Sequence, residues 1–311
     1  MSEFNYLIDK IYKSEFREYP FKFVYIENFL EENHFKNIIN QKSIKTSGKN
    51  FDELNYSLKI NGWEPHRHPG SFEDLKAYKK WRKKNSFNNK NLYGDPASKL
   101  LCEGSGMTYR LNLLPDLLNN LQQVFKSDLF LEMAVEKFSL SKTKNINIDG
   151  GFQKYLDGYE ISPHPDIREK ALTWMLNLNT DKNYQSKNYH THFMRFKKNK
   201  NYIYSLWDNY EMIQRQWVPW NWCESKFQQI KNNSITIFSP NTYSIHAIKA
   251  NYYDLDHQRT QLYGNVWYDS IFLKSYKPKF IPSTFKDLDY ENIVLNNKKK
   301  SIIKKLKSIR F

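Results

Sequence analysis

Short strand-like runs of apolar and polar residues follow one another from Leu131 to about Phe272. Turn-forming residues separate several of these runs, which is typical of the antiparallel strands of a sandwich or barrel. The runs are MAVEKFSL, GGFQKYL, KALTWMLNLN, HTHFMRF, YIYSLW, SITIFS, SIHAIKA and RTQLYGNVWY. About eight such strands predict a mainly β protein whose core is a jelly roll.

Helical patterns precede these runs. Residues 21–26 predict a short strand, and a helix is expected to begin near Glu31. Residues 114–129 carry apolar side chains at helical spacing, with Pro115 near the start, and predict an amphipathic helix. Residues 42–110 are polar and interrupted by Gly and Pro, so we interpret them as an irregular insertion or lid. The jelly roll is therefore expected to have supporting N-terminal helices.

The chain divides into three parts on this interpretation. Residues 1–130 hold the N-terminal strand, helices and insertion, which pack on the core, and residues 131–276 form the β core. Residues 277–311 form a basic tail with nine Lys and one Arg against two Asp and one Glu. The tail alternates basic clusters with apolar residues, a pattern compatible with a short amphipathic helix or with a solvated end.

Composition fits a folded intracellular protein. A chain of 311 residues that is 40% hydrophobic can bury a large core. Cys102 and Cys223 lie far apart in the sequence, which favours reduced thiols over a disulfide framework. The sequence shows no apolar leader and no apolar run of about 18 residues, so we expect neither a signal peptide nor a transmembrane helix. The expected compartment is the cytoplasm.

The formal net charge of +15 raises nucleic acid or an anionic membrane as partners. However, the chain is also rich in Asn, Ile, Tyr and Phe, which together with Lys is the composition that an AT-rich genome produces. About half of the excess charge belongs to residues 277–311, and no nucleic-acid motif is recognisable. A nucleic-acid partner therefore rests on charge alone.

Three side chains form a candidate metal site. His164 and Asp166 lie two residues apart, so on an extended strand both point to the same face and can hold one ion. His246 lies within the run SIHAIKA, where Ile245 and Ile248 mark a buried setting. Two imidazoles and one carboxylate are the ligand set of non-haem Fe(II) centres that leave one face of the metal open. A lone His in such a strand is more often a hydrogen-bonded core residue than a ligand, but the HxD pair, the strand context and the later Arg259 favour the metal site.

The residues around these ligands resemble a known family. GFQKYLDGYEISPHPD, then REKALTWMLNLN, NNSITIFSPNTYSIHAIKA and QRTQLYGNVWY are similar to the Fe(II)/2-oxoglutarate dioxygenases, in particular their prolyl 4-hydroxylase-like branch. The resemblance covers roughly residues 130–270, and residues 20–30 resemble the entry strand and helix of the family. It implies a double-stranded β-helix core with Fe(II), 2-oxoglutarate and the co-substrate O₂. The implied reaction hydroxylates a C–H bond and releases succinate and CO₂.

Carried over to this sequence, the resemblance makes His164, Asp166 and His246 the iron ligands. It makes Arg259 the basic residue that pairs with the distal carboxylate of 2-oxoglutarate, since a guanidinium offers a bidentate clamp. Thr173 and Asn177 match strand positions that help to bind the same carboxylate, and Tyr155 matches an aromatic residue of the cofactor pocket. Asn177 replaces the Tyr often found there. The spacing from His246 to Arg259 is longer than usual, which leaves Lys249 as an alternative anchor.

Two alternatives stay open. His190 and His192 share the spacing of a metal-binding pair, so a cupin-like metal protein or a non-catalytic jelly-roll binding protein is the second hypothesis. The aromatic cluster of Trp217, Trp220 and Trp222 fits either core packing or a substrate wall. The substrate itself is not identified by the sequence. Peptides, glycans and small metabolites are all compatible with the site, because the fold does not determine the substrate.

Overall fold

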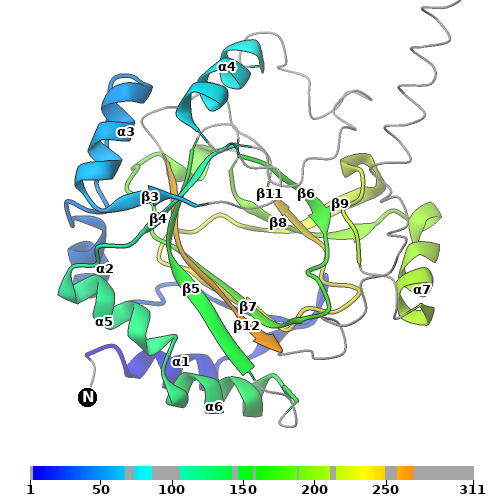
Figure 1. Ribbon diagram of the computed structural model, residues 1–311. Helices are drawn as coiled ribbons and strands as arrows, with labels where there is room; N and C mark the ends of the chain where they lie inside the picture. Colours follow the sequence, from blue (N-terminus) through cyan, green and yellow to red (C-terminus); the bar gives the residue numbers. More distant parts are fainter. Residues whose placement is uncertain are drawn as a thin grey trace, which may run out of the picture.

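Two antiparallel β-sheets face each other at the centre of the molecule in a computed structural model (Figure 1). Aromatic side chains from both sheets meet between them, with Phe193 4.7 Å from Phe23 and 5.6 Å from Phe238, measured between ring centroids. The structure describes residues 3–66, 72, 74–85, 106–141, 146–156, 159–187, 189–210, 215–248 and 258–268, with only the backbone described for residues 81–85.

The eight core strands pass back and forth between the two sheets. The larger sheet contains β5 (Ile146–Tyr155), β7 (Lys170–Asn177), β10 (Ile235–Phe238) and β12 (Arg259–Tyr268), in the order β10-β7-β12-β5. The smaller sheet contains β6 (Ile161–His164), β8 (Thr191–Phe196), β9 (Cys223–Gln229) and β11 (His246–Ile248), in the order β6-β11-β8-β9. Each strand is followed in the chain by a strand of the opposite sheet, except that β8 is followed by β9 in the same sheet. This connectivity is the predicted double-stranded β-helix, whose two sheets do not close into a barrel.

Short N-terminal strands extend the larger sheet to eight strands. The pair β1 (Phe16–Arg17) and β2 (Phe23–Ile26) adds to β10 at one edge. The pair β3 (Trp63–Pro65) and β4 (Thr108–Leu111) adds to β5 at the other edge. The segment interpreted as an irregular insertion, residues 42–110, therefore contributes strands to the larger sheet. It also contains the helices α3 (Phe51–Ile60) and α4 (Leu75–Asn85).

Four helices cover the outer face of the larger sheet, the face turned away from the smaller sheet (Figure 1). They are α1 (Tyr6–Lys13), α2 (Glu32–Ile39), α5 (Asp116–Val124) and α6 (Asp128–Lys137). Their apolar sides and the sheet form one core cluster. In this cluster the Trp174 ring of β7 stacks on Phe125, with ring centroids 5.6 Å apart, and makes an edge-to-face contact with Phe130, with ring centroids 5.4 Å apart. This packing fixes β7 from behind, so that its opposite face can carry the site.

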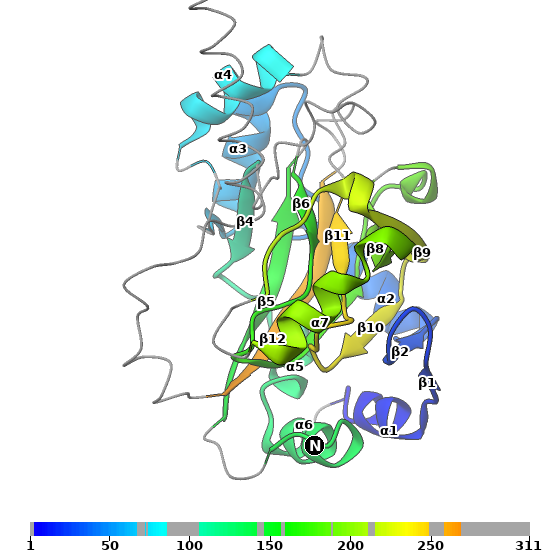
Figure 2. The same ribbon diagram turned by 90° about the vertical axis from the view of Figure 1, so that its right-hand side faces the viewer.

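Two of the expected strands are helices. Most of MAVEKFSL belongs to α6, which the Ser127 hydroxyl caps by accepting from Phe130 N at 3.1 Å. YIYSLW lies in α7 (Tyr202–Asn209), which Figure 2 shows beside the smaller sheet. In each case, buried residues recur at helical spacing: Phe130, Met133 and Ala134 in α6, and Ile203, Tyr204 and Trp207 in α7. The apolar content of these two segments suggested strands, but their buried residues have helical spacing, and both segments are helices.

Smaller features complete the description. The described part of the chain contains short 3-10 helices at Tyr184–Ser186, Lys198–Lys200 and Trp220–Trp222. Within the described ranges, no helix combines the length and apolar character needed to cross a membrane. Cys223 is a buried free thiol. Cys102, Lys249 and the basic tail at 277–311 lie outside the described residues, and the expected division at residue 130 stays a prediction.

Candidate metal centre and cofactor pocket

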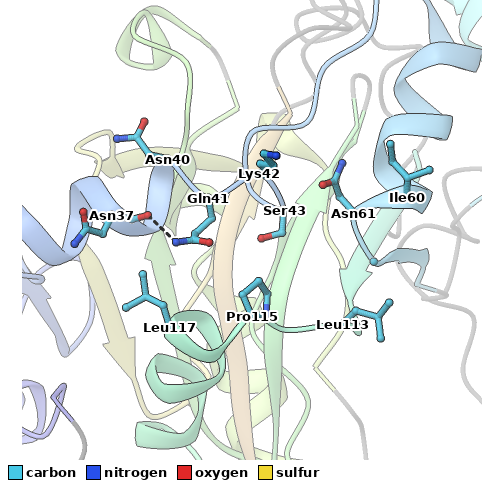
Figure 3. Close-up of a pocket in the computed structure, with 11 residues that line it drawn as sticks. Asn37, Asn40, Gln41, Lys42, Ser43, Ile60, Asn61, Leu113, Pro115 and Leu117 are labelled. Carbon is cyan, nitrogen blue, oxygen red and sulfur yellow. Dashed lines mark hydrogen bonds between the residues drawn. The ribbon is translucent and has the colours of Figure 1, made fainter.

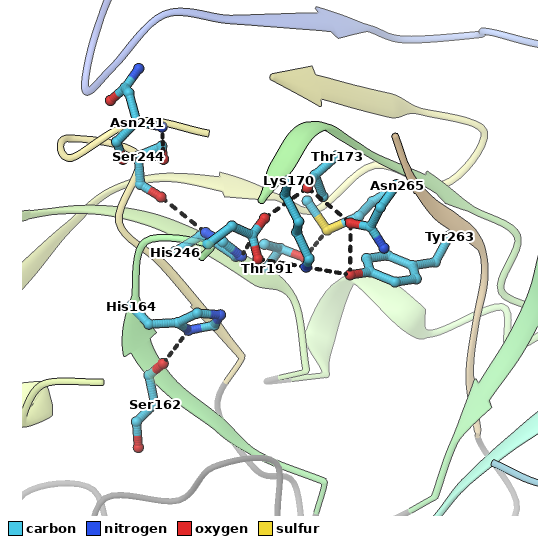
Figure 4. Close-up of polar contacts among 12 residues, drawn as sticks. Ser162, His164, Lys170, Thr173, Thr191, Asn241, Ser244, His246, Tyr263 and Asn265 are labelled. Atoms are coloured by element: carbon cyan, nitrogen blue, oxygen red, sulfur yellow. Dashed lines mark hydrogen bonds and ion pairs between the residues drawn. The ribbon is translucent and has the colours of Figure 1, made fainter. Parts of the chain in front are cut away.

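Two histidines face each other from neighbouring strands of the smaller sheet. His164 at the end of β6 is the direct partner of His246 at the start of β11, and their ring centroids lie 4.5 Å apart. Each ring places Nδ1 near a backbone oxygen two residues earlier, Ser162 O at 2.7 Å and Ser244 O at 3.0 Å (Figure 4). Because a carbonyl oxygen can only accept, Nδ1 of each ring carries the proton and Nε2 keeps a free lone pair for a metal ion.

The third candidate ligand follows β6 directly. Asp166 brings a carboxylate oxygen to 4.0 Å from His246 Nε2, and one ligand atom from each of the three side chains lies within 4.8 Å of the others. All three side chains are buried. Among the described residues, this is the one group of three or more metal-ligating side chains that could hold an ion.

Two neighbours orient the Asp166 carboxylate. Lys170 Nζ donates to Oδ1 at 2.6 Å, and the Thr173 hydroxyl donates to Oδ2 at 2.7 Å (Figure 4). Lys170 also lies 3.2 Å from the Tyr263 hydroxyl, and the Thr173 hydroxyl oxygen lies 3.0 Å from the side-chain amide of Asn265. These contacts hold the carboxylate in one orientation, as hydrogen-bonding partners outside a metal's ligand set generally do.

The protonation states suit a divalent metal. Burial, followed by the neighbouring His246, lowers the pKa of His164 to about 3, and burial also lowers the pKa of His246. Burial alone would raise the pKa of Asp166, but the Lys170 ammonium and then the two imidazoles outweigh it and lower that pKa below its ordinary value. At neutral pH the site therefore offers two neutral imidazoles and one carboxylate, which is the donor set that an Fe(II) centre with an open face requires.

A cavity of about 390 Å³ opens onto these three side chains. Its wall contains His164, Asp166 and His246, so an ion bound by them would face the cavity. One wall comes from β12, where Gln261, Tyr263, Asn265 and Trp267 all line the cavity. Apolar groups provide part of the remaining surface, among them Ile161, Met175, Trp217 and Ile248.

Arg259 lies at the start of β12, opposite Tyr155 in the pairing with β5. Its guanidinium is buried, donates through Nη2 to the Thr191 hydroxyl at 2.6 Å and lies 5.2 Å from the centre of the Tyr155 ring. Its Nη1 is buried and has no hydrogen-bond partner among the described residues. Burial lowers the pKa of Arg259 from a high ordinary value. The residue therefore presents an unused donor of the kind that binds a carboxylate.

The remaining two predicted cofactor residues are engaged with the protein. Thr173 supports Asp166, as described above. The Asn177 amide donates to Gln229 O at 3.2 Å and to Lys231 O at 3.1 Å, and its oxygen accepts from Gln261 Nε2 at 2.7 Å. Gln261 reaches the cavity, and its buried Oε1 has no hydrogen-bond partner among the described residues. Asn177 would therefore act on a ligand through Gln261, and both cofactor roles stay predictions.

The strand β12 contains site residues that the sequence interpretation missed. Every second residue from Arg259 to Trp267 faces the interior between the sheets, and Gln261, Tyr263 and Asn265 are polar or amphipathic. The intervening residues, Thr260, Leu262, Gly264 and Val266, pack on the other face. This period of two was readable in RTQLYGNVWY. Lys170 had no comparable signal, because only the folded chain brings it to Asp166.

The second histidine pair does not form a comparable centre. His190 Nε2 lies 3.3 Å from Gln185 O, whereas His192 Nδ1 lies 2.9 Å from the Ser225 hydroxyl. Neither belongs to a group of three metal-ligating side chains in the described part of the chain. Burial, followed by the nearby Arg259, lowers the pKa of His190 to about 4, so its ring is neutral.

The three tryptophans have separate roles. Trp217 stacks on His164, with ring centroids 5.5 Å apart and planes inclined by 28°, and lines the cavity. Trp220 donates to Glu160 at 2.8 Å, and Lys200 lies 4.5 Å above the Trp222 ring. The first residue is thus part of the site, and the other two pack against the small core cluster around α7.

Another hollow, of about 780 Å³, lies on the outside of the molecule near α2 and the start of α5 (Figure 3). Its wall is built from amides and apolar side chains, including Asn37, Asn40, Gln41, Ile60 and Leu113. It contains Lys42 but no carboxylate, imidazole or thiol among its lining residues. It therefore lacks the side chains that usually bind a metal ion.

Comparisons with known proteins gave similar structures only. No family model matches the chain, and no curated protein matches it in sequence. A prolyl-4-hydroxylase of Pseudomonas putida is similar with a TM-score of 0.42 and 8% identity, covering 86% of this chain and 100% of that one. A prolyl hydroxylase of Trichoplax adhaerens, in complex with a peptide of the hypoxia inducible factor oxygen degradation domain, has a TM-score of 0.41 and 10% identity, covering 85% and 88%. HygX of Streptomyces hygroscopicus, with nickel, 2-oxoglutarate and hygromycin B bound, has a TM-score of 0.35 and 7% identity, covering 78% and 82%.

The first two of these structures are prolyl hydroxylases, and 2-oxoglutarate is bound in the third. With TM-scores below 0.5, they transfer no substrate or residue role to this chain. The fold class rests on the strand order of β5 to β12, and the chemistry rests on the three candidate ligands and their neighbours.

Proposed function

We propose that the protein is an Fe(II)- and 2-oxoglutarate-dependent dioxygenase that hydroxylates a C–H bond of its substrate. The observation that carries the proposal is the buried group of His164, Asp166 and His246, whose ligand atoms lie within 4.8 Å of one another at the wall of a cavity. The overall reaction converts the substrate C–H, 2-oxoglutarate and O₂ into the hydroxylated product, succinate and CO₂.

The protein's part in this reaction begins with holding the metal. His164 and His246 would bind Fe(II) through Nε2, because Nδ1 of each ring is engaged by a backbone carbonyl. Asp166 would bind through its carboxylate, which Lys170 and Thr173 keep in place. When bound, the iron and 2-oxoglutarate supply the oxidising chemistry. Three ligands on one side leave the cavity side of the metal open for them.

Arg259 is the residue that we expect to anchor 2-oxoglutarate. Its buried Nη1 has no partner among the described residues, while Thr191 holds the guanidinium through Nη2. A carboxylate at this point would form a charge-assisted hydrogen bond and would compensate a buried positive charge. Tyr155, whose ring lies 5.2 Å from the guanidinium, would form one side of the pocket.

The cavity wall would then orient the substrate and keep water out. Trp217, Tyr263 and Trp267 provide flat apolar surfaces around the metal side chains. Such surfaces exclude water from a reactive centre and orient a substrate by packing.

The test is iron-dependent consumption of 2-oxoglutarate, measured as succinate by chromatography after incubation with Fe(II), ascorbate and O₂. The wild-type protein should form succinate even without its substrate, at a slow rate. Asp166→Ala should reduce this to the background of free iron, whereas His192→Ala, which removes an imidazole outside the candidate site, should not. Equal succinate formation by the Asp166→Ala and wild-type proteins would refute the proposal.

A further inference from the structure

A buried arginine reaches the cavity from the segment between β8 and β9. Arg215 is 5% exposed and lines the cavity, as does Trp217 two residues later. The segment is attached to the smaller sheet, because Val218 N donates to Pro163 O at 2.8 Å. This bond places Trp217 beside the metal-site residue His164, on which its ring stacks at 5.5 Å.

Both side chains present unused hydrogen-bond donors. Arg215 Nε and Trp217 Nε1 are buried and have no hydrogen-bond partner in the described part of the structure. Among the described residues of the cavity wall, the other lysine and arginine side chains each bind a carboxylate. Lys170 lies 2.6 Å from Asp166, and Arg110 lies 3.0 Å from Asp149. Arg215 forms no ion pair of this kind within the described ranges.

An uncompensated buried cation is costly. Removing a charged group from water costs several kcal/mol unless an opposite charge and hydrogen bonds replace the water. Burial, followed by repulsion from Arg168, lowers the pKa of Arg215 to about 10, which still leaves the guanidinium charged at neutral pH. Asp166, Glu169 and Asp208 attract it only at longer range. None of the described residues of the cavity wall therefore forms an ion pair that neutralises this positive charge.

We propose that Arg215 and Trp217 form a subsite for an anionic oxygen group, a carboxylate or a phosphate, on the substrate of the proposed oxygenase. The guanidinium supplies the charge and a directed N–H donor, and the indole supplies a second N–H donor. The subsite lies next to His164, so a substrate held there by its anionic group would have the rest of its structure over the metal side chains. The assignment of this anion to a substrate rests on the proposed function, whereas the binding of an anion does not depend on turnover.

The subsite is separate from the expected cofactor anchor. Arg259 begins β12 and contacts Thr191 and Tyr155, whereas Arg215 belongs to the segment that packs along β6. Two buried guanidinium groups with unused donors would let one bind the 2-oxoglutarate carboxylate while the other binds the substrate.

The test measures anion binding by titration calorimetry with three probes of similar size: benzoate, phenyl phosphate and the neutral benzamide. Each is titrated into the apoprotein and, without O₂, into protein with Fe(II) and excess 2-oxoglutarate. We expect benzoate or phenyl phosphate to bind at least about tenfold more tightly than benzamide, which is ~1.4 kcal/mol. Which of the two binds better identifies the anionic group. Excess 2-oxoglutarate should leave the preference intact, because it occupies a different guanidinium.

Three variants assign the effect. Arg215→Gln should abolish the preference, Trp217→Phe should weaken it while keeping the stacked ring, and Arg259→Gln should preserve it. Thermal unfolding shows that each variant is folded, and Arg215→Gln should be at least as stable as the wild type because it removes an unpaired buried charge. Equal binding of all three probes, or a preference that survives Arg215→Gln, would overturn the inference. Competition by 2-oxoglutarate, with loss of the preference in Arg259→Gln, would also overturn it by assigning the anion to the cofactor pocket.

Failure of the proposed function has a different result. A protein that binds no Fe(II) or 2-oxoglutarate could still show the Arg215-dependent preference in its apo form, and the subsite would then stand without the oxygenase.

Discussion

His164 and His246 are direct partners across the pairing of β6 with β11, with their rings 4.5 Å apart. The register of these two strands therefore determines the distance between the two candidate nitrogen ligands. Since successive residues of a strand point to opposite faces, a shift of one residue in this pairing would turn one imidazole away from the cavity. The site is thus encoded in strand pairing, and Asp166 completes it from the chain that follows β6.

The first prediction concerns the metal ligands. His164→Ala and Asp166→Ala should each weaken Fe(II) or Mn(II) binding by more than about 100-fold, because each removes one of three ligands. Substitution of a residue that only hydrogen-bonds to a metal ligand already lowers metal affinity by about 10–100-fold. Anaerobic titration calorimetry measures the affinity. His192→Ala is the matched control, since its ring contacts Ser225 outside the group. Wild-type affinity in both ligand variants would place the metal elsewhere.

The second prediction concerns the cofactor anchor. Arg259→Met should raise the dissociation constant of 2-oxoglutarate by about 30-fold or more, which corresponds to ~2 kcal/mol or more for a charge-assisted pair. Metal affinity should change little, because Arg259 contacts Thr191 and Tyr155 rather than the candidate ligands. Lys249→Met serves as the comparison, since Lys249 is the alternative anchor. Loss of 2-oxoglutarate binding in Lys249→Met alone would show that the assignment of Arg259 is wrong.

The third prediction concerns a buried lysine on the outer face of the larger sheet. Lys154 is fully buried, donates to the Thr260 hydroxyl at 2.9 Å and lies 5.2 Å from the Trp63 ring. Burial lowers its pKa to about 7 from 10.5. Between these two values the unfolded chain binds a proton that the folded protein releases, so the free energy of unfolding should rise with pH from about 7 to about 10.

Lys154→Met should remove this dependence. The variant should be more stable than the wild type at pH 7 by several kcal/mol, since each pKa unit corresponds to about 1.4 kcal/mol. The difference should shrink as the pH approaches 10. Urea unfolding at a series of pH values measures both curves. Parallel curves for the two proteins would mean that Lys154 keeps its proton in the folded state.

The fourth prediction concerns the packing behind the site. Gly264 in β12 lies opposite Trp174 of β7, and a Cβ at this position would come within 2.1 Å of the Trp174 ring. Since Phe125 and Phe130 enclose that ring, it cannot move freely. Gly264→Ala should therefore destabilise the protein by about 1–3 kcal/mol.

A neighbouring glycine provides the control. At Gly151, an added Cβ would meet the Gln122 side chain at 3.1 Å and Arg110 at 3.5 Å. The Gln122 oxygen is the end of a long side chain, which can shift, and 3.5 Å from Arg110 Nε is an ordinary van der Waals distance. Gly151→Ala should lower the unfolding temperature less than Gly264→Ala does. The opposite order would contradict the role assigned to the packing of Trp174.

The sequence predicts the β core well because strand positions with buried faces have a readable pattern. RTQLYGNVWY coincides with β12, and KALTWMLNLN contains β7. The sequence also predicts the three candidate metal ligands, and the structure brings them together at one cavity. Their spacing follows from strand geometry, in which residues two apart share a face.

Other features depend on tertiary contacts that a linear pattern does not contain. Lys170 reaches Asp166 only in the folded chain, and Arg215 is placed by the bond from Val218 to Pro163. The strand β9 was not expected, because its residues Glu224, Ser225 and Lys226 are exposed and its pairing with β8 provides its order. The sequence predicts strands where the structure has α6 and α7, because aromatic and β-branched residues have high strand propensity even in segments that fold as helices.

The most direct test of the central claim is an anaerobic titration of the apoprotein with one equivalent of Fe(II) and then with 2-oxoglutarate, followed by visible absorption. We expect a weak charge-transfer band that appears only when both are present, is absent in His164→Ala and requires much more 2-oxoglutarate in Arg259→Met. A folded wild-type protein that gives no band, or a band unchanged in His164→Ala, would contradict the assignment of the iron and 2-oxoglutarate site.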